Sequence, residues 1–175
     1  MGNKMSSIIR KAEVKDCALI LTFINELAAY EHLEDCVVGT AEQIQETLFT
    51  SNPRAEVLIL EENGQPAGFA LYFHNYSTFL CRYGIYIEDI YVREQYRGKG
   101  YGKQLLRHIC SLALEKDCGR VEWWCLDWNK PSIDFYLNLG AEPMSDWTVY
   151  RLNRSEIETI SQSETSNNLK LVASN

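Results

Sequence analysis

Three glycines at alternate positions, Gly98, Gly100 and Gly102, constrain the fold most, because of what stands on either side of them. Residues 83–92 before them are rich in Ile, Tyr and Val, which is typical of a strand with a buried side. After them, leucine and isoleucine recur at the three- and four-residue spacing of an amphipathic helix. The chain therefore contains a strand, a glycine turn and a helix in succession, which indicates a mixed α/β domain.

The rest of the chain supplies further strands and helices. Strand-forming runs lie at 7–11, 56–62, 67–73, 121–126 and 147–152. Apolar residues at helical spacing follow Asp16, Thr40 and Pro131, and Thr40 opens a capping-box pattern. The pair Asn63-Gly64 predicts a tight hairpin turn between two of the strands.

The length of the chain limits the number of domains. Its 175 residues leave room for one domain of ordinary size, and we find no linker and no internal repeat. We therefore expect a single domain over residues 1–160. Beyond Ser161 the sequence turns to Ser, Gln, Thr and Asn, which predicts a flexible tail at 161–175.

The balance of charge limits the classes of partner. The chain carries 17 Lys and Arg against 24 Asp and Glu, a formal net charge of -7. This charge disfavours nucleic-acid binding and stable membrane association, and it favours a cationic partner. No run reaches the roughly 18 apolar residues of a spanning helix, and no secretory signal is found, which predicts a cytoplasmic protein. The cysteines and histidines show no metal-binding spacing, so we expect no metal.

The glycine turn is the first candidate for chemistry. Closely spaced glycines let backbone amides approach phosphate groups, and a helix N-terminus adds a positive dipole. The spacing fits neither GxxxxGK[ST] nor GxGxxG, the two common phosphate-binding patterns. Five bases and one acid lie between Arg93 and Arg107, which reverses the sign of the charge locally. The segment is either an anion-binding site or a solvated turn with a basic helix start.

The second candidate is the pair Glu88 and Asp89, inside the apolar run at 83–92. Neighbouring residues of a strand point to opposite faces, so at least one of these carboxylates should be enclosed if the strand has a buried side. Enclosure raises the pKa of an unpaired carboxylate, which suits a general base that works near neutral pH. The alternative is a structural carboxylate that is tied to a nearby arginine or to backbone amides.

The third candidate is a segment without bases. Residues 16–53 contain no Lys or Arg and seven acids. Glu26, Glu31, Glu34 and Asp35 lie near the end of the first predicted helix, where the helix dipole disfavours negative charge. These acids either form an ordinary solvated surface or gather a polycationic ligand.

Four blocks of the sequence resemble one known family. Arg97-Gly98-Lys99-Gly100-Tyr101-Gly102 resembles the acetyl-CoA motif of the GNAT superfamily of acetyltransferases. Segments 29–31, 86–92 and 128–136 resemble the branch that contains the diamine (spermidine/spermine) and thialysine acetyltransferases. The resemblance implies an α/β (α+β) fold: a mixed, largely antiparallel sheet with helices on both faces. The central strands should splay apart to admit the cofactor, and the protein should form a homodimer.

The resemblance also implies roles for individual residues. Glu88 matches the carboxylate that deprotonates the amine, and Tyr136 matches the tyrosine that acts as general acid. The alternative for Tyr136 is an ordinary core aromatic. The cofactor-binding positions are Ile90, Tyr91, Val92, Arg97, Gly98, Lys99, Gly100, Tyr101, Gly102, Lys103, Asn129, Ser132 and Tyr136. The candidate substrate-binding positions are Tyr30, Glu31, Glu34, Glu88 and Asp89.

The implied reaction is direct transfer of the acetyl group of acetyl-CoA to a primary amine, without a metal. A polyamine or diamine suits the acidic segment. A lysine-like amino acid such as thialysine is the alternative, and its α-carboxylate would need a cation near Glu88. Arg82 lies about 20 Å away along an extended strand, which leaves Arg120 or Arg151. A non-catalytic module that binds acetyl-CoA or a partner is the alternative of another class.

Overall fold

A computed structural model describes residues 6–163 of the chain. The described residues form two compact units, one up to Leu126 and one from Asp127 on. No helix among these residues has the length and apolar character that crossing a membrane requires. The single domain expected over 1–160 stays a prediction.

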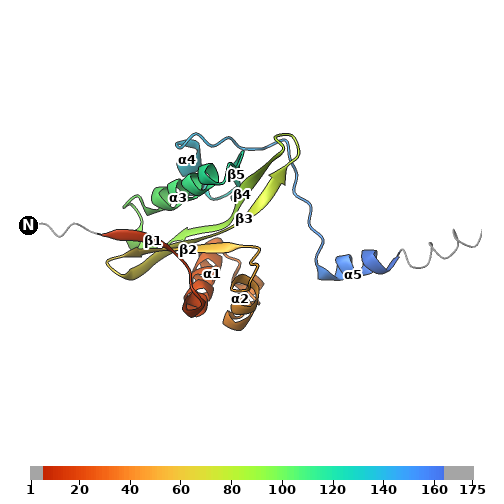
Figure 1. The fold of residues 1–175 in the computed structure, drawn as a ribbon, viewed down its shortest axis with the longest axis horizontal. Coiled ribbons are helices and arrows are strands. Elements are labelled where there is room, and N and C mark those ends of the chain that lie inside the picture. Colours follow the sequence, from red (N-terminus) through yellow and green to blue (C-terminus); the bar gives the residue numbers. More distant parts are fainter. Residues whose placement is uncertain (1–5, 164–175) are drawn as a thin grey trace, which may run out of the picture. The chain divides into compact units, whose positions relative to one another are not determined.

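A five-stranded sheet forms the body of the first unit (Figure 1). Its strands lie side by side in chain order: β1 (Ser7–Lys11), β2 (Glu56–Glu62), β3 (Gln65–Ser77), β4 (Arg82–Val92) and β5 (Val121–Trp123). The pairs from β1 to β4 are antiparallel, and only β4 and β5 are parallel. The predicted mixed, largely antiparallel sheet is confirmed.

Helices cover both faces of this sheet, as expected (Figure 1). One face carries α1 (Cys17–Glu31) and α2 (Ala41–Leu48), where Phe23 of α1 stacks on Phe69 of β3 with ring centroids 5.1 Å apart. The other face carries α3 (Tyr101–Glu115), whose Leu105 and Ile109 are fully buried. The capping box predicted at Thr40 is present at the start of α2.

Two irregularities distinguish the second half of β4. Leu71 pairs with Asp89 and Tyr72 with Ile87, so Glu88 is an extra residue, a β-bulge, without a partner on β3. The parallel pairing with β5 covers only residues 85–87 of β4. From Asp89 to Val92, β4 therefore has a paired edge toward β3, and from Glu88 on it has no described strand partner on its other side. The predicted splay of the central strands is confirmed.

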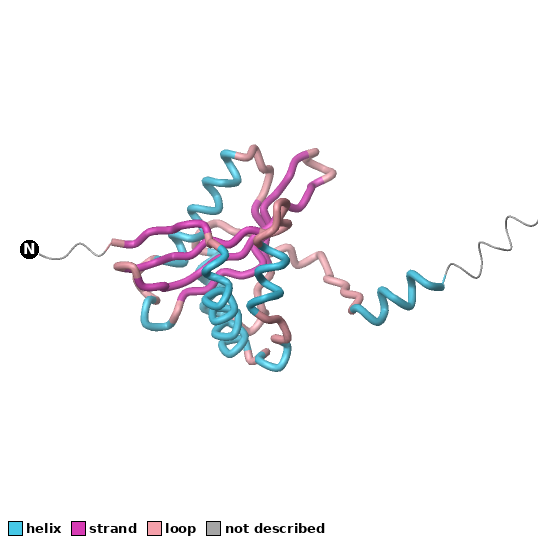
Figure 2. The backbone as a smooth tube through the Cα atoms, turned by 60° about the horizontal axis from the view of Figure 1, so that its bottom comes forward, coloured by secondary structure: helices cyan, strands magenta, loops and turns pink. Residues whose placement is uncertain are grey.

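The β3–β4 hairpin is longer than the sequence predicted. β2 pairs with β3 only as far as Tyr72, while β3 continues to Ser77, so the end of the hairpin extends past the other strands (Figure 2). The extension was missed because His74 and Asn75 interrupt the apolar run. Their backbone groups are nevertheless paired with β4, at Ile85 and Gly84.

The second unit contains α4 (Lys130–Leu137) and α5 (Arg154–Ser163). The helix predicted after Pro131 is confirmed, but the strand predicted at 147–152 is wrong, because these residues form no strand and are all exposed. Trp147 is 70% and Tyr150 90% exposed. Strand-forming residues make a strand only where a second strand supplies hydrogen bonds, and the sequence pattern cannot report that partner. Of the predicted tail, 161–163 belong to α5 and 164–175 lie outside the described residues.

Candidate active site

The glycine turn opens α3 with two residues in the left-handed region of backbone conformation. Gly98 has φ 76° and Gly100, the N-cap of α3, has φ 81°. A Cβ atom added at either glycine would meet no atom within 4 Å, so open space lies directly beside the backbone. The first amides of a helix have no acceptor inside the helix and stand at the positive end of its dipole. The turn is therefore a cradle into which a phosphate group fits.

The base in the middle of the turn is already paired. Lys99 donates to both carboxylate oxygens of Glu62, at 2.8 and 3.0 Å, and the hydroxyl of Tyr101 donates to the same carboxylate. Glu62, at the end of β2, is only 9% exposed, and its two donors hold its pKa below the ordinary value. This network anchors the turn to the sheet. The Lys99 side chain thus binds protein, and its predicted contact with a cofactor would have to come from its backbone amide.

The two arginines before the turn reach α1. Arg93 makes a two-pronged ion pair with Glu26, with closest contacts of 2.8 Å. Arg97 donates from Nε to the carbonyl of Val92 at 3.0 Å. Its guanidinium lies 4.7 Å from the centre of the Tyr30 ring and 5.8 Å from that of Tyr91. The local excess of bases is therefore mostly engaged with the protein, while Lys103 remains exposed at the start of α3.

Three carboxylates gather where α1 ends beside β4. Burial, followed by the charges of Glu88 and Glu31, raises the pKa of Asp89 from 3.8 to about 6. Burial also raises the pKa of Glu31, the last residue of α1. Asp89 is half-buried and Glu88 is exposed, so Asp89 is the more enclosed carboxylate of the pair, as the sequence predicted for one of the two. Strict alternation does not apply here, because Glu88 is the bulge residue and Asp89 pairs with Leu71, which packs toward α1.

The structure brings together most of the predicted residues of the first unit. The cofactor positions Ile90, Tyr91 and Val92 lie on the part of β4 beyond its pairing with β5. The guanidinium of Arg97 contacts the rings of both Tyr30 and Tyr91 and so links these two residues. Glu31 lies close enough to Asp89 for its charge to raise the pKa of Asp89. Glu34 lies in a short 3-10 helix after α1 (η2, Glu34–Cys36) and is exposed. Sequence reasoning missed Glu62 altogether, because nothing in its own neighbourhood distinguishes it from the adjacent Glu61.

The remaining predicted residues belong to the second unit. Asn129 is buried and caps α4, its side-chain oxygen accepting a hydrogen bond from the amide of Ser132 at 3.3 Å. Tyr136 is half-buried, with its ring 5.3 Å from that of Phe135. The capping explains why an asparagine precedes this helix. The cofactor contacts of Asn129 and Ser132 and the acid role of Tyr136 stay predictions.

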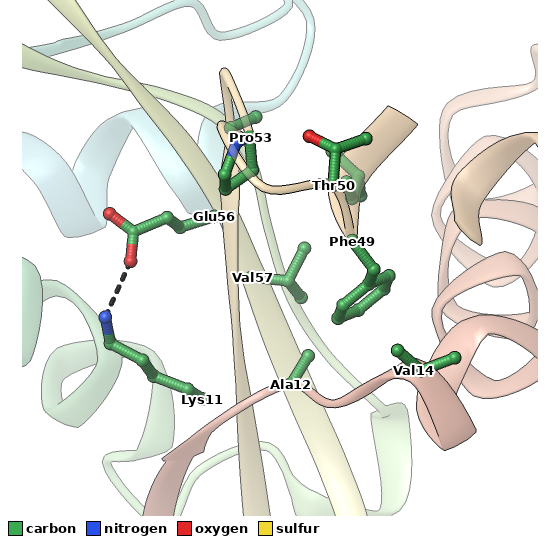
Figure 3. A pocket seen from close by; sticks show the side chains of 10 residues that line it. Lys11, Ala12, Val14, Phe49, Thr50, Pro53, Glu56 and Val57 are labelled. Atoms are coloured by element: carbon green, nitrogen blue, oxygen red, sulfur yellow. Dashed lines mark hydrogen bonds and ion pairs between the residues drawn. The ribbon is translucent and has the colours of Figure 1, made fainter. Parts of the chain in front are cut away.

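A cavity in another part of the first unit contains none of the predicted residues. It has a volume of about 300 Å³ and lies between the end of β1, the end of α2 and the start of β2. Figure 3 shows its apolar side chains, among them Phe49 and Val57, and Lys11 facing Glu56 across an ion pair of 2.8 Å. Because its only charged lining groups neutralise each other, we place the candidate site at the turn and the carboxylates instead. Among the described residues, no three His, Cys, Asp or Glu side chains lie close enough together to hold a metal ion.

Comparison with known proteins identifies the family. The sequence profile described as the acetyltransferase (GNAT) family matches residues 26–141. The thialysine N-epsilon-acetyltransferase of Sus scrofa is 38% identical over 157 residues, which cover 83% of this chain and 92% of that protein. The L-ornithine N5-acetyltransferase NATA1 of Arabidopsis thaliana is 32% identical over 204 residues, covering 91% and 90%.

Two further matches are informative. The spermidine/spermine N(1)-acetyltransferase-like protein 1 of Homo sapiens is 35% identical over 159 residues, which cover 85% of this chain and 23% of that protein. Among solved structures, an integron cassette protein from the mobile metagenome of V. cholerae has a TM-score of 0.76 at 23% identity. That match covers 90% of this chain and 99% of the solved chain, and it supports the fold alone.

Proposed function

The chain belongs to the acetyltransferase (GNAT) family, and from this premise we propose that its acceptor is the terminal primary amine of a small cationic alkylamine. Membership makes the chain an N-acetyltransferase, so the non-catalytic module is no longer a candidate. The observation that carries the proposal is the carboxylate cluster of Glu31, Glu88 and Asp89 at the unpaired part of β4. A cationic amine is the group that such a cluster attracts.

The cosubstrate of this family, acetyl-CoA, supplies a thioester whose carbonyl carbon accepts the amine. The residues present fit it. The cradle at Gly98 and Gly100 leaves open space beside backbone amides, as a pyrophosphate requires. Beyond its pairing with β5, β4 has an edge without a described strand partner up to the Val92 carbonyl that Arg97 occupies, and there an extended pantetheine chain can hydrogen-bond like a strand. We assign these two surfaces to the cosubstrate.

The carboxylates prepare the amine. An alkylammonium group with a pKa near 10.4 is about 3.4 units from neutral pH, so its deprotonation costs on the order of 4 to 5 kcal/mol. We assign proton acceptance to Glu88, which is exposed and is not held in a regular strand position. Asp89, the next residue, with its raised pKa, is the second candidate. Tyr136 would protonate the departing thiolate, since its hydroxyl is the acid that the family resemblance assigns.

A diamine or polyamine is the first candidate substrate. Two of the arginines that could hold an α-carboxylate are paired elsewhere, Arg82 with Asp117 and Arg120 with Glu122. Arg151 is exposed in the second unit. An amine with a second positive charge gains from the acids at the end of α1, and it needs no cation from the protein.

A lysine-like amino acid is the second candidate, and the relatives favour it. Two of them are a thialysine and an L-ornithine acetyltransferase, and both of these amino acids carry an α-carboxylate as well as a terminal amine. The two candidates share the reacting group and differ in the charge at the other end of the molecule. A comparison of substrates therefore separates them.

The test is acetyl transfer to a panel of amines, with release of free CoA measured at pH 7.5 and physiological salt. The panel contains a diamine, spermidine, L-ornithine, thialysine and a monoamine of the same chain length. We expect kcat/KM for the diamine and for spermidine to exceed that for the monoamine by about tenfold or more, because of the second charge. If kcat/KM for ornithine or thialysine exceeded that for the diamine and spermidine, the lysine-like amino acid would become the proposed substrate. No CoA release with any amine would refute the proposed acceptor.

We also propose that the protein forms a homodimer. The extended end of the β3–β4 hairpin supports this, because Tyr76 and Tyr83 pack against each other there with ring centroids 5.3 Å apart and both are more than half exposed. Exposed aromatic side chains of this kind are typical of interfaces between proteins. Sedimentation velocity of the full chain at micromolar concentration tests the state directly, and a monomer would contradict it.

A further inference from the structure

We propose that Arg97 is a positioning residue for the amine site, which holds the end of α1 against β4, and that its side chain is not a phosphate ligand. This inference rests on the proposed function for its kinetic test. It concerns the side chain alone, since the backbone of the same residue leads into the glycine cradle.

The contacts of Arg97 all point toward α1 and β4. The Nε atom donates to the carbonyl of Val92 at 3.0 Å, which fixes the guanidinium beside its own strand. The ring of Tyr30 lies 4.7 Å away and that of Tyr91 5.8 Å away, so the guanidinium connects the last turn of α1 to β4. We call this arrangement the Tyr30–Arg97–Tyr91 stack. A planar guanidinium suits such a stack better than an ammonium group does.

Repulsion between carboxylates makes such a connection necessary. Glu31, next to Tyr30, lies close enough to Asp89 to raise the pKa of Asp89. Like charges on α1 and β4 therefore push the end of α1 away from the strand. The residues after Glu31 are hydrogen-bonded back to α1 itself, through the amide of Leu33 and the carbonyl of Ala28, so these bonds do not tie the end of the helix to β4.

Arg93 and Arg97 both connect α1 to β4, but they do so through different kinds of contact. One turn earlier, Arg93 joins α1 to the same segment through the carboxylate of Glu26, which neutralises that acid, and its guanidinium also lies over the ring of Phe23. Beside Glu31, Arg97 contacts α1 through the Tyr30 ring and pairs with no acid there. The stack therefore closes the gap between α1 and β4 without pairing with Glu31 or Asp89, and these two carboxylates keep their charge for the amine.

The experiment compares Arg97→Lys, which keeps the charge and loses the planar stack, with Arg107→Lys, the same change at an exposed base of α3. Calorimetry gives Kd for acetyl-CoA, and initial rates at saturating acetyl-CoA give KM and kcat for a diamine and for thialysine. For Arg97→Lys we expect KM to rise about 3- to 30-fold for both amines, the usual range for a stack of this kind. Kd for acetyl-CoA should stay within about twofold, and Arg107→Lys should change neither constant.

A second measurement does not depend on catalysis. Amide hydrogen exchange of the wild type and of Arg97→Lys should show faster exchange at residues 27–32 in the variant, and no change in the core of α3. A double-mutant cycle with Tyr30→Leu should show that the two changes are not additive in KM. If the panel of amines shows no acetyl transfer at all, the proposed function fails while the exchange result still decides the role of Arg97.

Three results would overturn the proposal. Weaker acetyl-CoA binding with an unchanged amine KM would make the Arg97 side chain a phosphate ligand. A rise in KM for thialysine but not for the diamine would make it the cation that binds an α-carboxylate. Unchanged exchange at 27–32 together with unchanged kinetics would leave the Tyr30–Arg97–Tyr91 stack without a role.

Discussion

The glycine turn and the carboxylate cluster are both charged, but only at the turn are some of the charges paired with groups of opposite sign. Lys99 is paired with the buried Glu62, and Arg93 with Glu26. At the cluster, burial and mutual repulsion raise the pKa of Asp89 to about 6. Compensated charges stabilise a backbone shape, whereas uncompensated ones cost stability and are typical of sites that act on a ligand. We therefore expect the turn to act by its shape and the cluster by its charge.

The largest effect should follow from removing one charge of the cluster. Glu88→Gln keeps the shape of the side chain and removes the proton acceptor, so turnover of a protonated alkylamine at pH 7 should fall by about 10² to 10⁴. The fall should shrink as pH rises toward the pKa of the amine. The measurement is kcat between pH 6.5 and 9.5. Wild-type turnover in Glu88→Gln, with a large loss in Asp89→Asn, would move the base to Asp89.

The next effect tests whether the turn acts by its shape. Gly100→Asp places a carboxylate in the open space beside the backbone, and we expect Kd for acetyl-CoA to rise about 100-fold in calorimetry. Gly100→Asn is the matched control, because asparagine has the same size and tolerates a positive φ as well. The rise in Kd for acetyl-CoA should be several-fold smaller in Gly100→Asn than in Gly100→Asp. Equal binding by all three proteins would remove the phosphate assignment from the turn.

A smaller effect concerns the free energy of unfolding, which the carboxylate cluster should lower when Asp89 is ionised. The raised pKa of Asp89 means that the folded protein binds this proton more tightly than the unfolded chain does, so stability falls as pH rises from about 4 to about 6. Asp89→Asn should therefore increase the free energy of unfolding in urea by about 1 to 3 kcal/mol at pH 8. At pH 4 the gain should be absent. Glu34→Gln, at an exposed acid, should change stability by less than about 0.5 kcal/mol at either pH.

The smallest effect separates the two substrate candidates. Replacing Glu31 and Glu34 by glutamine should raise KM for a triamine about 3- to 10-fold and spare kcat, because these acids bind ground and transition states alike. In the wild type, KM for the triamine should rise with salt more steeply than KM for a monoamine, since the Debye length falls from about 10 Å at 0.1 M to about 3 Å at 1 M. Unchanged triamine kinetics in the double variant would favour the lysine-like substrate.

The sequence predicted the parts of the site that are local in the chain. Alternate glycines before a helix determine the shape of the turn, and two acids in an apolar strand predict one enclosed carboxylate, found at Asp89. It did not predict the direction of the side chains at the turn. Lys99 and Arg97 look alike as bases, and only tertiary neighbours far away in the chain, Glu62 and Tyr30, decide where each one points.

The strand predicted at 147–152 failed for the same reason. Its pattern of Trp147, Val149 and Tyr150 satisfies the local preference for a strand, yet a strand also needs a hydrogen-bonded neighbour. In the described part of the chain that neighbour is missing, and the side chains are exposed. The β-bulge at Glu88 was missed because no type of amino acid at this position indicates that β4 has one residue more than the facing part of β3.

The bulge at Glu88 has a consequence for how the strand tolerates changes in length. Ile87 and Asp89 pair with the neighbouring residues Tyr72 and Leu71. Deleting Glu88 would therefore leave a regular strand in which every other residue keeps its partner and its face. The pairing of β3 with β4 therefore does not depend on Glu88, and the proposed base is a single residue inserted into an otherwise regular pair of strands.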